Sequence, residues 1–410
     1  MKNQELSLKA NMIWNSFGSL VNLGCQWLIT ILIVRMGSGY EAAGVFSLAM
    51  SVYNIFAPIG QYRMYTYQVT DVNNENSTGE YLSFRHITNG VALLLCMGYS
   101  LITCDHEALA AIFLYTVYKS VCLVIDVFHA CDQRHHRMDY IGQSLALQGV
   151  FSLGSFIIVF WATASLEFAL LAMTIAVMLV GTVFDWPRVR QFGPIETSIS
   201  IAKVRHLAIR CLPIVVASIA AAAAPSLPRQ YLSSVSGDAM LGIYAAAAAP
   251  VALIQTGASY IYNPLLGYFS ERFAARDKRG FNGLFAKATL GIIALGLLCS
   301  AGVMGFGEPL LVLVYGSKMS GYGYLLPPLV VLALFTGYMW FVNDLLMAVR
   351  NFRGAFLGNA VALLVSVACL PLIGVWGMDG VTLICLASCL TGILVMAASL
   401  IIQLWGYWSR

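Results

Sequence analysis

Long apolar runs recur from one end of the chain to the other, separated by short polar segments. A helix needs about 20 residues to cross about 30 Å of hydrocarbon, because each residue adds about 1.5 Å. The runs reach this length and are continuous, which favours membrane helices over the alternating strands of a membrane barrel. We therefore predict about twelve membrane helices. Their ranges are 11–34, 42–62, 87–104, 108–130, 140–162, 166–184, 207–227, 241–266, 284–304, 324–347, 355–375 and 380–403.

The composition supports an all-α polytopic membrane protein. Hydrophobic residues make up 59% of the 410 residues and charged residues only 10%, whereas soluble domains carry about 25% charged residues. The mean hydropathy is +0.78. The polar segments between the runs are too short to form a soluble domain. The run at 11–34 is too long for the core of a signal peptide, so we expect it to remain as the first membrane helix.

The distribution of basic residues predicts the orientation of the chain. With an even number of crossings both termini lie on one side, and nearly all of the 23 Lys and Arg residues then fall on that side. Only Arg35, Arg229 and Lys318 fall on the other side, and Lys119 lies inside a predicted helix. Cytoplasmic loops carry such an excess. We therefore expect cytoplasmic termini. The net charge of +4 reflects this bias and needs no nucleic-acid partner.

The two halves of the chain resemble each other. A polar interval at 185–210 divides the predicted helices into a bundle of six at 1–190, a cytoplasmic linker at 191–206 and a second bundle of six at 207–410. Residues 42–49 and 240–247 share a pattern of glycine, aliphatic, aromatic and small residues. Internal repeats of this kind occur in transporters. The alternative is that glycine and aromatic residues are simply common near membrane interfaces.

Three segments carry a resemblance to a known family. The run at 11–35, followed by Gly39 to Ala49, resembles the opening of bacterial polysaccharide flippases, in the superfamily that includes the MATE drug exporters. Residues 229–244 are similar to the second-half counterpart, and residues 308–316 resemble the turn after the ninth helix. Pro228 stands where the family pattern has an acidic residue, so the match at that position is incomplete.

The resemblance implies two six-helix bundles around a central polar cavity, a MATE-like architecture. It also implies a flippase that moves a polyprenyl-diphosphate-linked oligosaccharide from the inner to the outer leaflet by alternating access, and a location in the bacterial inner (cytoplasmic) membrane. The implied partners are this substrate, membrane lipids, and a polymerase or ligase of polysaccharide biosynthesis. Two other functions stay open: a MATE-type ion-coupled drug antiporter, and an integral-membrane glycosyltransferase or polymerase. The last would need acidic residues in sizeable loops, and the loops here are small. The sequence has no phosphate-binding loop, zinc-protease helix or nucleophile elbow, which argues against an ATP-driven pump or a membrane protease.

Polar residues form a stripe along the first predicted helix. Their spacing of three or four residues places them on one helix face. The residues are Asn15, Ser19, Asn22, Gln26 and Thr30. The helix at 241–266 carries a shorter counterpart, formed by Gln255, Ser259 and Asn263. Such a stripe lines a polar pathway, or it joins neighbouring helices through hydrogen bonds of about 0.6 kcal/mol each.

Charged residues within helices are the other candidates for the substrate pathway. Lys119 lies near the middle of the helix at 108–130, where a lysine facing lipid costs about 2.5–3.5 kcal/mol. It therefore faces a polar cavity and an anionic substrate, or its side chain reaches toward the interface. Arg229 lies at the outer end of its helix and is a candidate to receive the diphosphate or to act as an interfacial anchor. If transport is coupled to an ion, Asp126 and Asp344 are the candidates.

The cysteines and one short cluster of metal-ligand residue types give little evidence for a metal or cofactor site. Most of the ten cysteines lie within apolar runs, as small hydrophobic residues do. Cys104, Asp105, His106 and Glu107 are adjacent metal-ligand types in a predicted external turn. One short cluster without a second pair of ligands is weak evidence for a metal site. We therefore expect no metal, no cofactor and no enzymatic activity.

Overall fold

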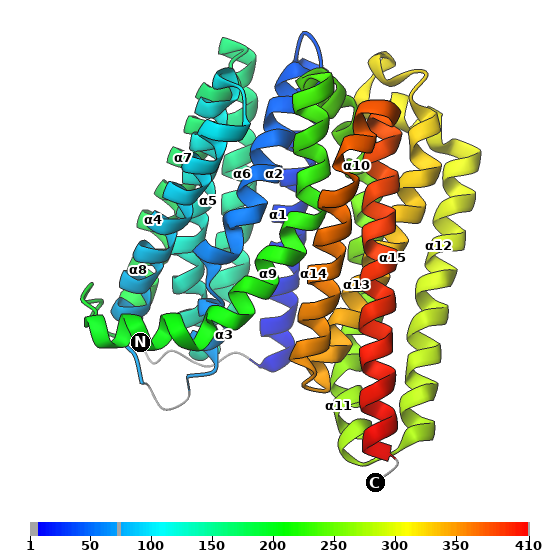
Figure 1. Cartoon of the computed structure of the whole chain (residues 1–410). Helices are drawn as coiled ribbons and strands as arrows, with labels where there is room; N and C mark the ends of the chain where they lie inside the picture. The colour runs from blue at the N-terminus through cyan, green and yellow to red at the C-terminus, as the bar shows by residue number, and fades with distance from the viewer. Residues whose placement is uncertain (1–6, 72–74, 409–410) are drawn as a thin grey trace. The chain divides into compact units, whose positions relative to one another are not determined.

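The computed structural model describes residues 7–71 and 75–408, and helices account for almost all of them (Figure 1). The first half contains α1 (Leu8–Met36), α2 (Glu41–Gln61), α3 (Met64–Val69), α4 (Thr78–Thr103), α5 (His106–Arg134), α6 (Met138–Thr163), α7 (Leu166–Val180), the π-helix η1 (Gly181–Asp185) and α8 (Trp186–Val189). The second half contains α9 (Ile201–Ser236), α10 (Asp238–Tyr262), α11 (Leu266–Ala274), α12 (Lys278–Tyr315), α13 (Leu326–Ala348), α14 (Phe352–Cys369) and α15 (Ile373–Trp408). The described residues form no strand, so the predicted all-α class is confirmed.

The helices match the predicted membrane crossings. Among the described residues, 11 helical stretches are long and apolar enough to span a membrane. The last stretch, Phe352–Tyr407, has 56 residues and is too long for one crossing. It is interrupted at Leu370–Leu372 and at Gly377, whose φ of 54° is not helical, so it contains two of the predicted helices. Large apolar side chains such as Trp161 are exposed on the helices, as lipid-facing residues are.

The orientation of the chain stays a prediction. The basic residues behind it include Lys2 and Arg410, which lie outside the described residues. The cysteines are free, as their apolar surroundings led us to expect. Within the described chain, no group of three or more His, Cys, Asp or Glu side chains is placed to hold a metal ion.

The chain forms two compact units. The first extends to Ile219 and the second begins at Ala220, so α9 runs from one unit into the other. The predicted linker, 191–206, lies in the first unit and ends in the first turns of α9. Its role as a linker between two functional bundles stays a prediction.

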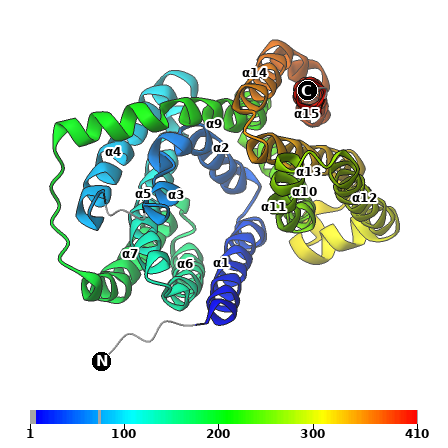
Figure 2. The same ribbon diagram turned by 90° about the horizontal axis from the view of Figure 1, so that it is seen from below.

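In the first unit, α5 packs against α2, α3, α4, α6 and α7, and α1 packs along α6 (Figure 2). Small residues allow the close contact between α1 and α6. A Cβ atom on Gly142 would lie 2.1 Å from the carbonyl oxygen of Trp14, and one on Gly18 would lie 2.0 Å from the carbonyl oxygen of Gly142. The backbones therefore touch, which brings the polar stripe of α1 next to α5 and α6.

The buried carboxylate of Asp71, just after α3, binds residues at and before the start of α4. Asp71 accepts hydrogen bonds from the backbone N–H groups of Glu75 and Asn76, at 2.9 and 3.1 Å, and from the hydroxyl of Tyr81 at 2.8 Å. Burial opposes the charge of this carboxylate, but the three hydrogen bonds outweigh it and hold the pKa of Asp71 below its usual range.

In the second unit, α10 packs against α12 and α13, and α14 packs against α15. Aromatic side chains fill its core, where Phe269, Phe281 and Phe341 are almost fully buried. The unit thereby covers the apolar faces of its helices, and its outer surface carries exposed residues such as Met304 and Phe306.

Candidate functional site

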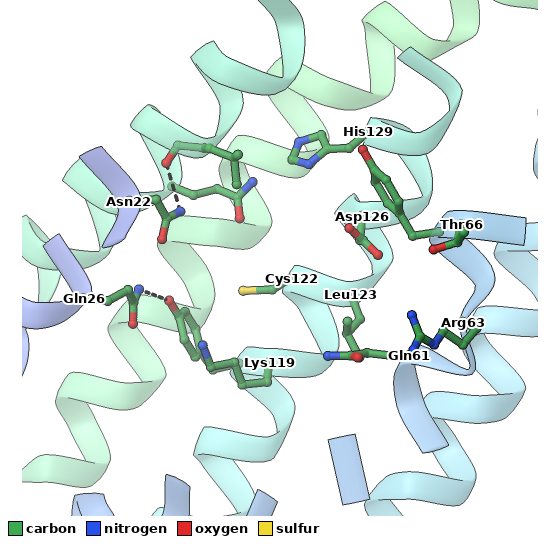
Figure 3. Close-up of a pocket in the computed structure, with 14 residues that line it drawn as sticks. Asn22, Gln26, Gln61, Arg63, Thr66, Lys119, Cys122, Leu123, Asp126 and His129 are labelled. Carbon is green, nitrogen blue, oxygen red and sulfur yellow. Dashed lines mark hydrogen bonds between the residues drawn. The ribbon is translucent and has the colours of Figure 1, made fainter. Parts of the chain in front are cut away.

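The first unit contains a polar cavity of about 430 Å³ (Figure 3). Side chains from α1, α2, α3, α5 and α6, and from the break between α2 and α3, surround it. The lining residues are Asn22, Gln26, Gln61, Arg63, Tyr65, Thr66, Tyr118, Lys119, Cys122, Leu123, Asp126, His129, Leu145 and Gln148. Most of them are polar, although they belong to helices whose outer faces are apolar.

A break in the second membrane helix supplies one wall of this cavity. α2 ends at Gln61, and Tyr62 and Arg63 adopt left-handed backbone conformations with φ of 44° and 57°. The left-handed region is uncommon for residues other than glycine. α3 then begins at Met64, so Gln61, Arg63 and Tyr65 all face the cavity. The break thus turns a helix end into a polar surface.

Arg85 on α4 satisfies the backbone groups that the break exposes. Its side chain is 0% exposed, and its guanidinium donates to the carbonyl oxygens of Gly60 and Gln61 at 2.5 and 2.7 Å. Carbonyl groups within a membrane need such partners, because no water is available there. The same guanidinium lies 3.4 Å from the carboxylate of Asp126, which lines the cavity. Arg85 therefore both holds the break and compensates the negative charge of Asp126.

Lys119 faces the cavity from the middle of α5. Its ammonium lies 5.6 Å from the ring centre of Tyr115 and 5.3 Å from that of Tyr118, within the range of cation–π contacts. Among the residues described, no carboxylate lies within 4.0 Å of the ammonium. Arg63 has no such partner either in this part of the chain. The cavity therefore presents two cations without a paired carboxylate, and its acid, Asp126, is already paired.

Two members of the predicted stripe on α1 reach the cavity. Asn22 donates to the carbonyl oxygen of Leu145 at 3.0 Å, and Gln26 donates to the hydroxyl of Tyr118 at 2.7 Å. Both therefore line the cavity and join α1 to its neighbours. Asn15 is half-buried and Ser19 is exposed, and neither is among the lining residues.

The other predicted pathway residues belong to the second unit and do not line this cavity. Gln255, Ser259 and Arg229 are half-buried there, and Asn263 is exposed at the end of α10. The hydroxyl of Ser259 donates to the carbonyl oxygen of Thr256 in its own helix. These four assignments stay predictions.

Asp344 lies in a hydrogen-bonded network of the second unit. The hydroxyl of Tyr262 donates to its carboxylate at 3.0 Å, and the side-chain amide of Asn343 donates to it at 3.2 Å. Asn359 in turn donates to Asn343 at 3.0 Å. The network joins α10, α13 and α14, so its members hold these helices together. A role of Asp344 or Asp126 in ion coupling stays a prediction.

Sequence reasoning missed several residues of the cavity. The basic-residue distribution treats Arg63 and Arg85 as loop cations, yet Arg63 lines the cavity and Arg85 is buried behind it. His129 and Gln148 also line the cavity, and no sequence pattern singles them out. The polar interruption at 61–63 within an apolar run is the signal that could have indicated the break in the helix.

The chain is similar to known proteins in sequence and in fold. No family model matches the chain. The chain is 23% identical over 297 residues to the capsular polysaccharide biosynthesis protein CapF of Staphylococcus aureus, and the match covers 72% of this chain and 74% of CapF. Among solved structures it is similar to the lipid II flippase MurJ in an inward closed conformation, with a TM-score of 0.75, 12% identity, and 98% of this chain and 90% of MurJ covered.

Solved structures of transporters are also similar to this chain in fold. An inward-facing multidrug resistance MATE family transporter matches with a TM-score of 0.69, 12% identity, and 97% of this chain and 98% of the transporter covered. A transporter from Pyrococcus furiosus, described as having a binding pocket of reverse polarity, matches with a TM-score of 0.62, 11% identity, and 98% and 97% covered. These structural matches are transporters and a flippase. The chain is thus a multi-pass membrane protein with the fold shared by the MurJ flippase and the MATE transporters, the fold that its sequence resemblance implied.

Proposed function

We propose that this protein is a flippase that moves a polyprenyl-diphosphate-linked oligosaccharide from the inner to the outer leaflet for surface polysaccharide biosynthesis. It works by alternating access in the bacterial inner membrane, beside the polymerase or ligase that uses its product. The observation that carries the proposal is the positive cavity of the first unit, where Lys119 and Arg63 lack a paired carboxylate among the described residues.

The electrostatics of the cavity favour an anionic headgroup. A diphosphate diester carries roughly two negative charges, and leaving water for a membrane is costly for each of them. Lys119 and Arg63 offset this cost, and the amides of Gln26 and Gln61 supply neutral hydrogen-bonding groups. When the cytoplasmic side of the membrane is electrically negative, the membrane potential favours outward movement of each negative charge by about 2.3 kcal/mol per 100 mV.

The size of the cavity fits part of such a substrate. Its volume of about 430 Å³ lies at the lower end of the range of small-molecule sites, about 300–1,000 Å³. It accommodates the diphosphate and the adjoining sugar, so we expect the rest of the oligosaccharide and the polyprenyl chain to lie outside it. The similarity to CapF, a capsular polysaccharide biosynthesis protein, supports a polysaccharide precursor as the substrate.

The MATE-type drug antiporter makes the opposite electrostatic prediction. A site for cationic drugs requires carboxylates that are free to meet the drug, whereas Asp126 is paired with Arg85. Neutralising Lys119 should then leave drug export unchanged or improve it. For the flippase, the same substitution removes an interaction with the diphosphate.

The decisive experiment replaces Lys119 by methionine in a strain that lacks the chromosomal gene. Losing a charged hydrogen bond costs about 1.5–3 kcal/mol, which corresponds to about 10- to 150-fold in affinity. Lys119→Met should therefore accumulate lipid-linked oligosaccharide in the inner leaflet, and Lys119→Arg should restore part of the transport because it keeps the charge. The control is Lys287→Met, which removes the same charge from an exposed position in α12. Normal transport by Lys119→Met would rule the proposal out.

A labelling experiment tests the accessibility of the position itself. After the native cysteines are replaced, Lys119→Cys should react with a membrane-impermeant thiol reagent, because the position lines a polar cavity. Val150→Cys is the control, because Val150 is exposed on the outer face of α6, where lipid surrounds it. If neither position reacts in any state, Lys119 does not face water, and the electrostatic argument fails.

A further inference from the structure

A second polar cluster lies behind the cavity, and the proposed transport does not use it. It consists of His129 and Asp132 on α5 and Asp185 at the end of η1, with Ser144 and Gln148 on α6. Asp132 and Asp185 are 0% exposed and His129 is 5% exposed. η1 is a π-helix, a rare geometry that is frequent at functional sites.

The hydrogen bonds of this cluster are incomplete. Ser144 donates to Oδ2 of Asp185 at 2.9 Å, and Gln148 donates to Ser144 at 3.0 Å. Nε2 of His129 lies 3.6 Å from Oδ1 of Asp185, which is too long for a hydrogen bond. Neither carboxylate oxygen of Asp132 has a hydrogen-bond partner among the described residues. The cluster thus contains a fully buried carboxyl group that accepts no hydrogen bond from the described residues.

The charges around Asp132 do not supply the missing partner. The titratable and charged groups that face it are His129 and Cys131 on its own helix, Asp185 on η1, Tyr65 on α3, and Arg137 and Asp139 at the start of α6. The guanidinium of Arg137 already donates hydrogen bonds to both carboxylate oxygens of Asp139, at 2.9 Å each. An ionised carboxylate that is buried without a partner costs several kcal/mol. Such a group takes up a proton instead.

We propose that this cluster is a proton-binding site in which the carboxyl group of Asp132 holds the proton, and that His129 carries protons between this carboxyl group and the cavity. The position of His129 supports the exchange role, because this residue lines the cavity (Figure 3). Its Nε2 also lies 3.6 Å from Oδ1 of Asp185. His129 and Asp132 are three residues apart on α5, so they lie on neighbouring parts of one helix face.

A proton fits this cluster better than a metal ion. Hard cations such as Ca²⁺ and Mg²⁺ take six or more oxygen ligands. The described part of the chain has no group of three or more side chains placed to hold a metal ion. A histidine beside buried carboxyl groups is suited to proton exchange, because the unperturbed side chain changes its charge near neutral pH.

Infrared spectroscopy of the purified protein, without substrate, tests the proposal. A protonated carboxylic acid has a carbonyl stretch that an ionised carboxylate lacks. We expect this band in the wild type at neutral pH, its loss in Asp132→Asn, and its retention in Asp105→Asn, which alters an exposed carboxylate at the start of the same helix. Asparagine has the shape of the neutral acid, so Asp132→Asn should keep the elution profile of the wild type. Absence of the band from the wild type, or its survival in Asp132→Asn, would overturn the proposal.

A second variant tests the exchange role and leaves both carboxyl groups in place. In heavy water the band should shift as the proton is replaced by deuterium, and we expect His129→Gln to slow this replacement at least about tenfold. An unchanged rate would remove His129 from the proposal. Lys119→Met should keep the band, so this result and the transport result are independent of each other.

Discussion

Arg85 offers the most direct test of how the cavity is built. Arg85→Met keeps much of the apolar side chain and removes the guanidinium. The carbonyl oxygen of Gly60 still accepts from the hydroxyl of Thr88 at 3.0 Å. The carbonyl oxygen of Gln61 keeps no hydrogen-bond donor among the described residues. We therefore expect the break after α2 to be destabilised.

The expected magnitude follows from these contacts. A buried polar group left without a partner costs about 1–3 kcal/mol. Breaking a buried ion pair costs about 3–5 kcal/mol, but the side chain of Asp126 is 32% exposed, so this part is smaller here. Together they predict a loss of about 2–4 kcal/mol in the free energy of unfolding. Arg85→Lys should lose less, because it keeps the charge but not the fork that reaches two carbonyl groups.

Thermal unfolding of the purified protein in detergent measures this loss. Arg353→Met is the control, because Arg353 is exposed and such substitutions change stability by no more than about 0.5 kcal/mol. Adding Asp126→Asn to Arg85→Met should recover part of the loss, since the unpaired carboxylate is then gone. If Arg85→Met unfolds like the control, Arg85 does not hold the break, and this account of the cavity wall is wrong.

Three further predictions concern packing, acid stability and orientation. Gly142→Ala should cost about 1–3 kcal/mol in thermal unfolding, because its Cβ would lie 2.1 Å from a backbone oxygen of α1, whereas Gly154→Ala, in open space, should cost little. The lowered pKa of Asp71 means that its stabilisation is present above about pH 4 and is lost as the pH falls through the lowered value. Asp71→Asn should therefore lose about 1.5–3 kcal/mol at neutral pH and flatten the acid limb of a stability profile. Accessibility tags at 131–139 should report the cytoplasm and tags at 104–107 the outside; an inverted pair would refute the predicted topology.

The all-α class and the membrane crossings could be predicted from the amino-acid sequence alone. Each predicted range coincides with helical structure, including the two that the break at 370–377 separates. The reason is that a membrane helix makes its backbone hydrogen bonds within its own segment. Its length and its apolar composition can therefore be recognised in that stretch of sequence alone. The stripe on α1 was also visible, because its spacing alone places Asn22 and Gln26 on one face.

Which polar residues contact one another depends on how the helices pack. In the sequence, Arg85 cannot be distinguished from other cations near helix ends; its contact with the break follows from the packing of α4 against α2. Asp185 lies near His129 only because η1 packs against α5. The packing of α1 against α6 likewise determines which residues of the α1 stripe line the cavity and which do not. These contacts join residues far apart in the chain, and hydrophobic periodicity specifies only that a helix has a polar face. Which partner meets that face depends on how the helices pack, because packing is a property of the assembled bundle.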